Sequence, residues 1–281
     1  MPDHAAKSKP KSMDGKLRRR RGLTLAELLV ASTIMLLIAA AVATLAATVQ
    51  STNDYCKGHT VSAQHARVAL SRIERAVQYA VANEQFPGCI VVTEQVGSQE
   101  LPHTLVVWNP TGTAANPTGL PLISEIVVFC PNPAHPNTLL EIRSPNDNTP
   151  VPAATNPSAW RTLTDQLKSS SSTTKVLLTD RMRTSPLTGD YSDSLSPSDL
   201  RGAVRFRRLM APSDQQWAQF RGGTRTWQNI DWPQDSYRAT SGTRVVACQT
   251  ELQIVPGAMG SAAVTAIPFY GSATITYELS R

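Results

Sequence analysis

The chain has 281 residues, of which 41% are hydrophobic, and it carries a formal net charge of +6 at pH 7. Residues 1–22 hold eight Lys and Arg against two Asp, which accounts for the whole excess, and the remainder balances 19 basic with 19 acidic residues. This placement argues against a protein that binds nucleic acid through an overall basic charge, and the composition is ordinary for a globular domain.

An uncharged segment follows the basic N-terminus, from Leu28 to Val49. It is long enough to cross a bilayer as a helix, which takes about 20 apolar residues. Basic residues beside such a segment remain on the cytoplasmic side of the membrane. We therefore expect a cytoplasmic N-terminus and a single globular head on the other side.

Two ordinary interpretations of this segment are a signal anchor and a secretory signal peptide. The signal peptide would be cut after Ala41-Val42-Ala43, a small-x-small site, and the mature chain would start at Thr44. Neither interpretation explains Glu27, an acid near the start of the apolar stretch. An unpaired charge in lipid costs about 2.5 kcal/mol or more, so Glu27 requires a partner.

The segment Arg20-Arg-Gly-Leu-Thr-Leu-Ala-Glu-Leu-Leu29 resembles the processing motif of the type IV pilin-like prepilin family. Basic residues precede Gly22 at position −1, Leu23 is the apolar +1 residue and Glu27 stands at +5. The resemblance implies that prepilin peptidase cuts between Gly22 and Leu23 and methylates the amine of Leu23. Leu23 departs from the commoner Phe, and the 22-residue leader is long.

Beyond a polar junction, a second set of apolar residues recurs at helical spacing and predicts an amphipathic helix. These residues are Ala66, Ala69, Leu70, Ile73, Ala76, Val77, Ala80 and Val81. The resemblance implies one long helix, with residues 23–49 as its transmembrane and assembly half and residues 50–86 as an amphipathic half against a β-sheet. The run that begins at Ala66 also resembles a run in larger minor pilins and J-type pseudopilins.

The remaining residues, 87–281, read as a β-rich head, because short β-like runs alternate with Pro, Asn and Gly. The expected strands are Ile90–Thr93, Thr104–Trp108, Glu125–Cys130, Thr138–Arg143, Lys175–Thr179, Ala203–Leu209, Arg244–Ile254 and Ala273–Leu279. Two short helices are expected, at Ser158–Leu167 and at Ser213–Phe220, the second opened by a capping serine. The predicted fold class is α+β, a long N-terminal helix packed on a mainly antiparallel β head.

The four cysteines are widely spaced, without a Cys-x-x-Cys pair that would indicate a zinc ribbon or a thioredoxin-like site. An exported head could oxidise them, and three fully paired connectivities remain open. We expect Cys130 to pair with Cys248, because both lie in expected core strands. Cys56 would lie about 40 Å below the top of a helix that continues to Ala82, which argues against a direct bond to Cys89.

A membrane-anchored periplasmic enzyme is one alternative class, but Gly-x-Ser-x-Gly, His-Glu-x-x-His and phosphate-loop motifs are absent. Cys130 with His135 is a two-residue coincidence rather than a metal site. The acids Asp190, Asp193 and Asp199 lack the spacing of a calcium loop. We therefore expect no catalytic residues, no cofactor and no metal.

A second alternative is a DNA-binding minor pilin of a competence system. Eight arginines and three acids lie between Arg201 and Arg244. Strand alternation would place Arg205 and Arg207 on one face and Val204 and Phe206 on the other. We favour a solvated strand face that pairs with the acid-rich residues 88–200.

Taken with the motif, these features predict a minor pilin or pseudopilin, a structural subunit of a type IV pilus or a type II secretion pseudopilus. The resemblance implies three kinds of partner: prepilin peptidase, other prepilins or pseudopilins, and an inner-membrane assembly platform. The subunit would sit in the inner membrane as a single-pass protein, with its head extracytoplasmic, and would then enter the filament. There the resemblance pairs Glu27 with the N-terminal amine of an adjacent subunit.

Overall fold

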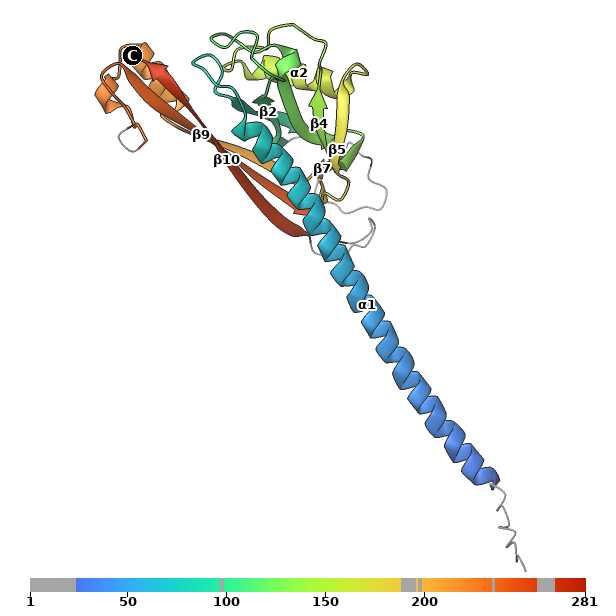
Figure 1. The fold of residues 1–281 in the computed structure, drawn as a ribbon. Coiled ribbons are helices and arrows are strands. Elements are labelled where there is room, and N and C mark those ends of the chain that lie inside the picture. Colours follow the sequence, from blue (N-terminus) through green and yellow to red (C-terminus); the bar gives the residue numbers. More distant parts are fainter. Residues whose placement is uncertain (1–23, 97–98, 188–195, 197–198, 234–235, 257–265) are drawn as a thin grey trace, which may run out of the picture. The chain divides into compact units, whose positions relative to one another are not determined.

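A computed structural model describes residues 24–96, 99–187, 196, 199–233, 236–256 and 266–281 (Figure 1). The chain divides into two compact units, Met1–Asn53 and Asp54–Arg281. The predicted fold class is confirmed: one long N-terminal helix is followed by antiparallel sheets.

Helix α1 covers Leu25–Gln78 and is long and apolar enough to cross a membrane. In the first unit all its residues are exposed, including the large apolar side chains of Met35, Leu36 and Leu37. A helix that is apolar all round needs a cover of lipid or of other helices.

In the second unit the same helix becomes amphipathic, as predicted. Its buried residues are Ser62, Ala66, Ala69, Leu70, Ile73, Ala76 and Val77, which share one face. The guanidinium of Arg72 extends from this helix to the buried carboxylate of Glu141, with Nε 2.7 Å from Oε2. Arg143 approaches the other oxygen of Glu141 at 3.1 Å, so the ion pair joins the helix to a core strand.

The helix ends at Gln78, so the prediction of a helical half that reaches residue 86 was wrong at its end. Beyond this point the amide of Val81 donates to the carbonyl of Trp108 in a strand. The side chain of Asn83 accepts bonds from the amides of Gln85 and Phe86. Asparagine stabilises turns in this way, and here the turn competes with helix continuation.

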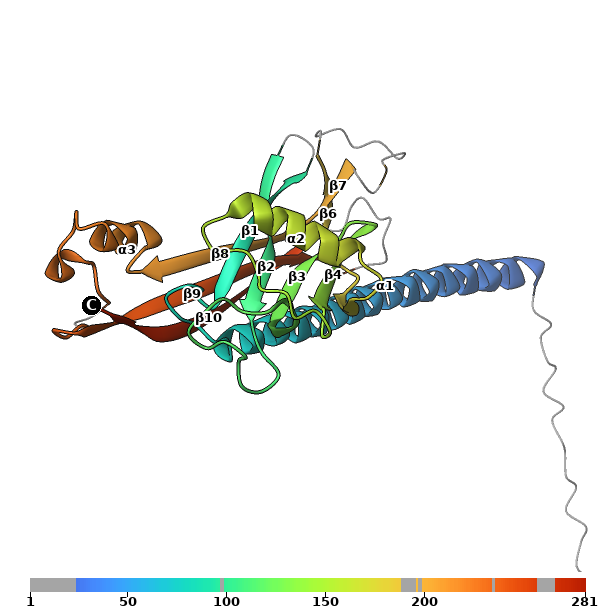
Figure 2. The same cartoon turned by 90° about the horizontal axis from the view of Figure 1, so that it is seen from above.

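Five antiparallel strands form the larger sheet, in the order of the sequence. They are β1 (Cys89–Val96), β2 (Gln99–Trp108), β3 (Ile126–Asn132), β4 (His135–Arg143) and β5 (Thr174–Thr179). Helix α2, Pro157–Ser169, lies over one face of this sheet (Figure 2) and is capped by the side chain of Asn156. A 3-10 turn, η1 (Ile123–Glu125), precedes β3.

Three long strands form a second antiparallel sheet in the order β10-β9-β8, and β9 and β10 make a long twisted ribbon (Figure 1). They are β8 (Val204–Ala211), β9 (Ser241–Ile254) and β10 (Ile267–Ser280). The short strands β6 (Thr184–Pro186) and β7 (Leu200–Gly202) pair with each other and were not predicted. Helix α3 (Asp214–Arg221) starts at its predicted capping serine, Ser213, and the turn η3 (Trp227–Asn229) follows.

The core has two main layers, one on each face of the five-stranded sheet. Alternate residues of β2 show the division: Leu105 and Val107 face a cluster that includes α1, β8, β9 and β10, whereas Val106 and Trp108 face α2. Burial on both faces explains why these strands read as nearly continuous apolar runs. All eight predicted strands are present.

Candidate functional site

The N-terminal site begins at the first described residues of the chain. The predicted cleavage residues Gly22 and Leu23 lie outside the described residues. Thr24 immediately precedes helix α1, and Glu27 stands three residues later.

Thr24 and Glu27 form a capping box at the start of α1. The amide and hydroxyl of Thr24 donate to Glu27 Oε2 at 2.9 and 3.0 Å, and the amide of Glu27 donates to Thr24 Oγ1 at 3.3 Å. A carboxylate in the first turn also interacts favourably with the helix dipole. The sequence analysis placed Glu27 but missed Thr24 as its local partner, although Thr-x-x-Glu is the sequence signal for this motif.

Both bonds from Thr24 reach the same carboxylate oxygen. Among the described residues, Glu27 Oε1 has no hydrogen-bond donor. Hydrogen bonds within the chain therefore occupy Oε2 of Glu27 and leave Oε1 available to a donor from another molecule.

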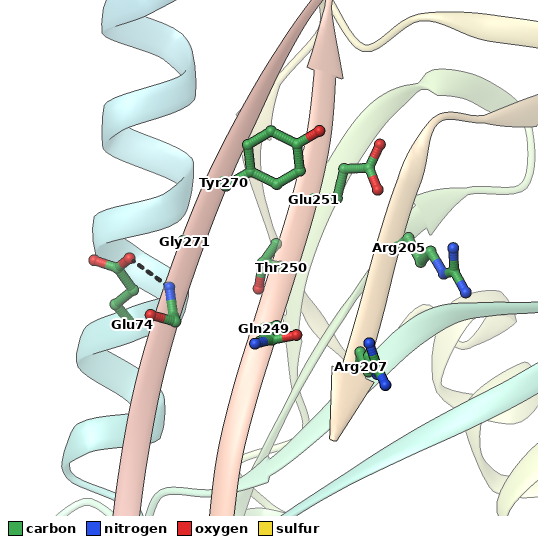
Figure 3. Close-up of a pocket in the computed structure, with 9 residues that line it drawn as sticks. Glu74, Arg205, Arg207, Gln249, Thr250, Glu251, Tyr270 and Gly271 are labelled. Atoms are coloured by element: carbon green, nitrogen blue, oxygen red, sulfur yellow. Dashed lines mark hydrogen bonds between the residues drawn. The ribbon is translucent and has the colours of Figure 1, made fainter. Parts of the chain in front are cut away.

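The head carries a groove of about 550 Å³ over the outer face of the three-stranded sheet, beside α1 (Figure 3). Glu74 lies at its helical side, where its Oε1 accepts a bond from the amide of Ser272 at 3.1 Å. A Cβ at Gly271 would lie 2.7 Å from that oxygen, so glycine lets α1 approach β10. The lining residues are Glu74, Arg205, Arg207, Gln249, Thr250, Glu251, Tyr270, Gly271 and Ser272.

The predicted alternation along β8 is confirmed. Arg205 and Arg207 are exposed and line the groove (Figure 3), whereas Val204 and Phe206 are buried. Arg205 lies opposite Glu251 in the register with β9, and both line a second pocket with Glu100, an acid of the 88–200 segment. With two acids and two arginines, the groove is charge-balanced rather than basic.

Most other arginines of the 201–244 segment serve the head itself. Arg244 is buried and donates to Pro212 O at 2.8 Å and to Asp214 at 2.7 Å. Arg208 donates to Cys89 O at 3.1 Å and to Asp214 at 3.0 Å. The number of arginines in this segment is therefore larger than the number that is available to bind a partner.

The structure corrects the expected cysteine pairing. Cys130 and Cys248 are both buried in core strands, but Cys130 lies in the layer against α2 and Cys248 in the opposite layer. All four thiols are free, and the thiol that interacts with Cys248 is that of Cys89. Strand alternation separates Cys130 from Cys248, and the sequence could not assign the two strands to faces of different sheets.

A buried ionic cluster in the head was missed by the sequence analysis. Glu94 Oε2 lies 3.0 Å from His103 Nε2 and also contacts Lys168 Nζ. Glu94 faces α2 on the same side of β1 as Val92, whereas His103 is brought to this side by a β-bulge, in which Pro102 and His103 of β2 oppose the single residue Thr93. Glu94, His103 and Lys168 line a cavity of about 230 Å³.

Burial alone would raise the pKa of Glu94, but the hydrogen bond from His103 and the charge of Lys168 outweigh it and lower the pKa to about 2. The carboxylate therefore stays ionised within the head. Two buried atoms of the lining residues have no hydrogen-bond partner among the described residues: Glu94 Oε1 and His103 Nδ1. The cavity is large enough for water to bond to such atoms.

Within the described residues, no group of three or more His, Cys, Asp or Glu could hold a metal ion. Cys130 is buried and His135 is exposed at the start of β4. Asp190 and Asp193 lie outside the described residues, and Asp199 accepts bonds from the amide and hydroxyl of Ser196. The absence of a metal, a cofactor and catalytic residues remains a prediction.

A family model, described as the prokaryotic N-terminal methylation motif, matches residues 17–43. The matched segment contains Gly22, Leu23 and Glu27 and the first part of the apolar helix. Neither the comparison with curated proteins nor that with solved structures finds a match.

Proposed function

Because this chain is a type IV prepilin-like protein by its N-terminal signature, we propose that it is a minor pilin or pseudopilin, a structural subunit of a type IV pilus or a type II secretion pseudopilus. Its processing enzyme is prepilin peptidase. Its other partners are further prepilins and an inner-membrane assembly platform.

One observation supports this proposal most directly: the signature continues into a helix whose described residues up to 53 are all exposed. Leu28–Val49 carry no charge, and exposing so many apolar side chains to water is unfavourable. The inner membrane covers this segment before assembly, with the N-terminus cytoplasmic and the head extracytoplasmic. Neighbouring helices cover it once the subunit joins the filament.

The capping box defines how Glu27 takes part in assembly. Thr24 holds Oε2 and orients the carboxylate, while Oε1 accepts a bond from the methylated amine of Leu23 in an adjacent subunit. Two opposite charges that meet in an apolar bundle offset each other's loss of solvation, so the contact sets the axial register between helices.

A structural role, rather than catalysis, is part of the proposal. It is supported by the absence of hydrolase and phosphate-loop motifs from the sequence. Binding of DNA through Arg205 and Arg207 is not proposed, because Glu74 and Glu251 line the same groove. The run from Ala66 to Val77 favours a minor pilin or J-type pseudopilin over a major pilin, and the neighbouring genes distinguish secretion, pilus and DNA-uptake systems.

The mass of the native N-terminus tests the proposal. We expect a mature chain that starts at Leu23 and carries one N-methyl group, since the signature places the cut after Gly22. A chain that starts at Thr44 would indicate an ordinary signal peptidase and would overturn the proposal. A chain that keeps its leader in cells with an active prepilin peptidase would overturn it as well.

A further inference from the structure

Two cysteines from different sheets meet inside the head. Cys89 is the first residue of β1 in the five-stranded sheet, and Cys248 lies in the middle of β9. Both belong to the same core cluster, and their exposed fractions are 0% and 2%. The two thiols influence each other: Cys248 lowers the pKa of Cys89, and Cys89 raises the pKa of Cys248.

Arg208 holds the two backbone segments together. In the register of β8 with β9 it is the partner of Cys248. Its Nη1 donates to the carbonyl of Cys89 at 3.1 Å, and its Nη2 donates to Asp214 at 3.0 Å. The pairing of β8 with β9 and the contact from Arg208 to Cys89 therefore bring the two cysteines close together.

We propose that Cys89 and Cys248 form a disulfide bond in the mature head, which joins the five-stranded sheet to the three-stranded sheet. The inference rests on the proposed function, because an extracytoplasmic head folds where thiols are oxidised. Cys56, exposed on α1, and Cys130, in the opposite core layer, remain thiols.

The oxidant is a protein disulfide of that compartment. The thiolate of one of the two cysteines attacks it, forms a mixed disulfide and releases one external thiolate. The thiolate of the other cysteine then attacks the sulfur of the first and expels the second external thiolate. Two thiols of the head are oxidised, one external disulfide is reduced to two thiols, and the two protons pass to these products.

Because both sulfurs are buried in the finished head, the exchange takes place before the two sheets close, while both thiols are accessible.

Peptide mapping of the full chain tests the inference. The protein is extracted from membranes with a thiol-blocking reagent present and digested without reductant. We expect one linked pair of peptides, Cys89 with Cys248, and blocked thiols at Cys56 and Cys130. A pair that includes Cys130 or Cys56 would overturn the inference.

Unfolding temperatures with and without reductant provide a second readout. The bond closes a loop of about 160 residues, so reduction should lower the unfolding temperature on the order of 10 °C. Cys89→Ser and Cys248→Ser should abolish the effect of reductant, whereas Cys130→Ser, also a buried position, should retain it. An equal effect of reductant in all three variants would contradict the proposal.

The N-terminal mass separates this inference from the proposed function. Free thiols at Cys89 and Cys248 in a chain that starts at Leu23 overturn the disulfide and leave the function in place. If the chain keeps its leader, the proposed function fails. Refolding with glutathione disulfide then decides the pairing, because a folded product with both thiols free overturns it.

Discussion

At the scale of single residues, hydrogen bonds between Thr24 and Glu27 explain one part of the N-terminal signature. The carboxylate is already bound to its own helix start through one oxygen. An acid in the apolar segment is therefore held in one orientation before it meets a second subunit. This explains how a charge at a fixed offset from the cleavage site can act as an assembly contact.

Replacing the carboxylate separates processing from assembly. Glu27→Ala should leave cleavage after Gly22 largely intact and impair co-purification with partner prepilins. The neighbour's amine would then be buried without its counter-charge, which costs about 3–5 kcal/mol. Leader removal is measured by mass spectrometry. Assembly is measured as the amount of partner prepilins that co-purify at equal expression.

Thr24→Ala is the matched control. It removes the hydroxyl of the capping box, which weakens the helix start by about 1 kcal/mol, but retains the charge. Assembly should be impaired less than in Glu27→Ala, because the amide of Thr24 still donates to Oε2. If Glu27→Ala assembles normally while its leader is retained, the carboxylate is a determinant of the peptidase and the assembly role is wrong.

At the scale of elements, the ionic cluster joins the first hairpin of the head to α2. Glu94 comes from β1, His103 from β2 and Lys168 from the last turn of α2. Glu94 faces the helix by the ordinary alternation of β1, whereas a bulge in β2 brings His103 to the same side. Pro102, in this bulge, has no amide to donate to the ladder. One local irregularity thus positions a contact between three elements.

This cluster predicts a loss of stability in acid. Because the pKa of Glu94 is about 2 in the folded head, below its ordinary value of 4.5, its contribution is present above pH 4.5 and is lost as the pH falls toward 2. The difference corresponds to about 3 kcal/mol. Unfolding temperatures of the full chain in detergent, measured from pH 7 to pH 2.5, should fall through this window.

Two glutamine variants identify the source of the acid effect. Glu94→Gln should be less stable at pH 7, since Lys168 loses its counter-charge, and should show a flatter fall below pH 4.5. Glu278→Gln, at an exposed position of β10, should show the same unfolding temperatures as the original chain at each pH. Parallel curves for the original chain and Glu94→Gln would assign the acid sensitivity to other carboxylates, such as Glu141.

At the scale of the whole molecule, stability and assembly belong to different parts of the chain. The described residues up to 53 are exposed, and the first buried residue is Ser62. The core therefore draws on the second unit alone. Residues after 22 have balanced charge, so the head is not driven toward acidic partners by its net charge.

A chain shortened to begin at Asp54 should fold as an independent head. It keeps every buried residue of the described core, and aspartate is a favourable residue at a helix start. We expect cooperative unfolding without detergent, at a temperature close to that of the full chain in detergent. Aggregation of the shortened chain, or an unfolding temperature far below that of the full chain, would show that residues before 54 are needed for the head.

Local patterns alone were enough to predict the signature, the spanning segment, the amphipathic helix and all eight expected strands. Each depends on residue spacing or on apolar periodicity within a few turns or a single strand. Gly22, Leu23 and Glu27 are recognisable for the same reason. The spacing of these residues can be read directly from the sequence, without knowledge of the fold.

Contacts between distant segments were decided by the tertiary structure. Cys248 meets Cys89 instead of Cys130 because the two sheets face each other across one layer of the core, and no local pattern states which layer a strand faces. Glu94, His103 and Lys168 come together through a bulge that reverses one side chain. The end of α1 at Gln78 depends on a strand carbonyl that lies far along the chain. Glu94 and His103 are nine residues apart across one hairpin, and the other partners lie tens of residues apart or more, so only the packed chain determines these contacts.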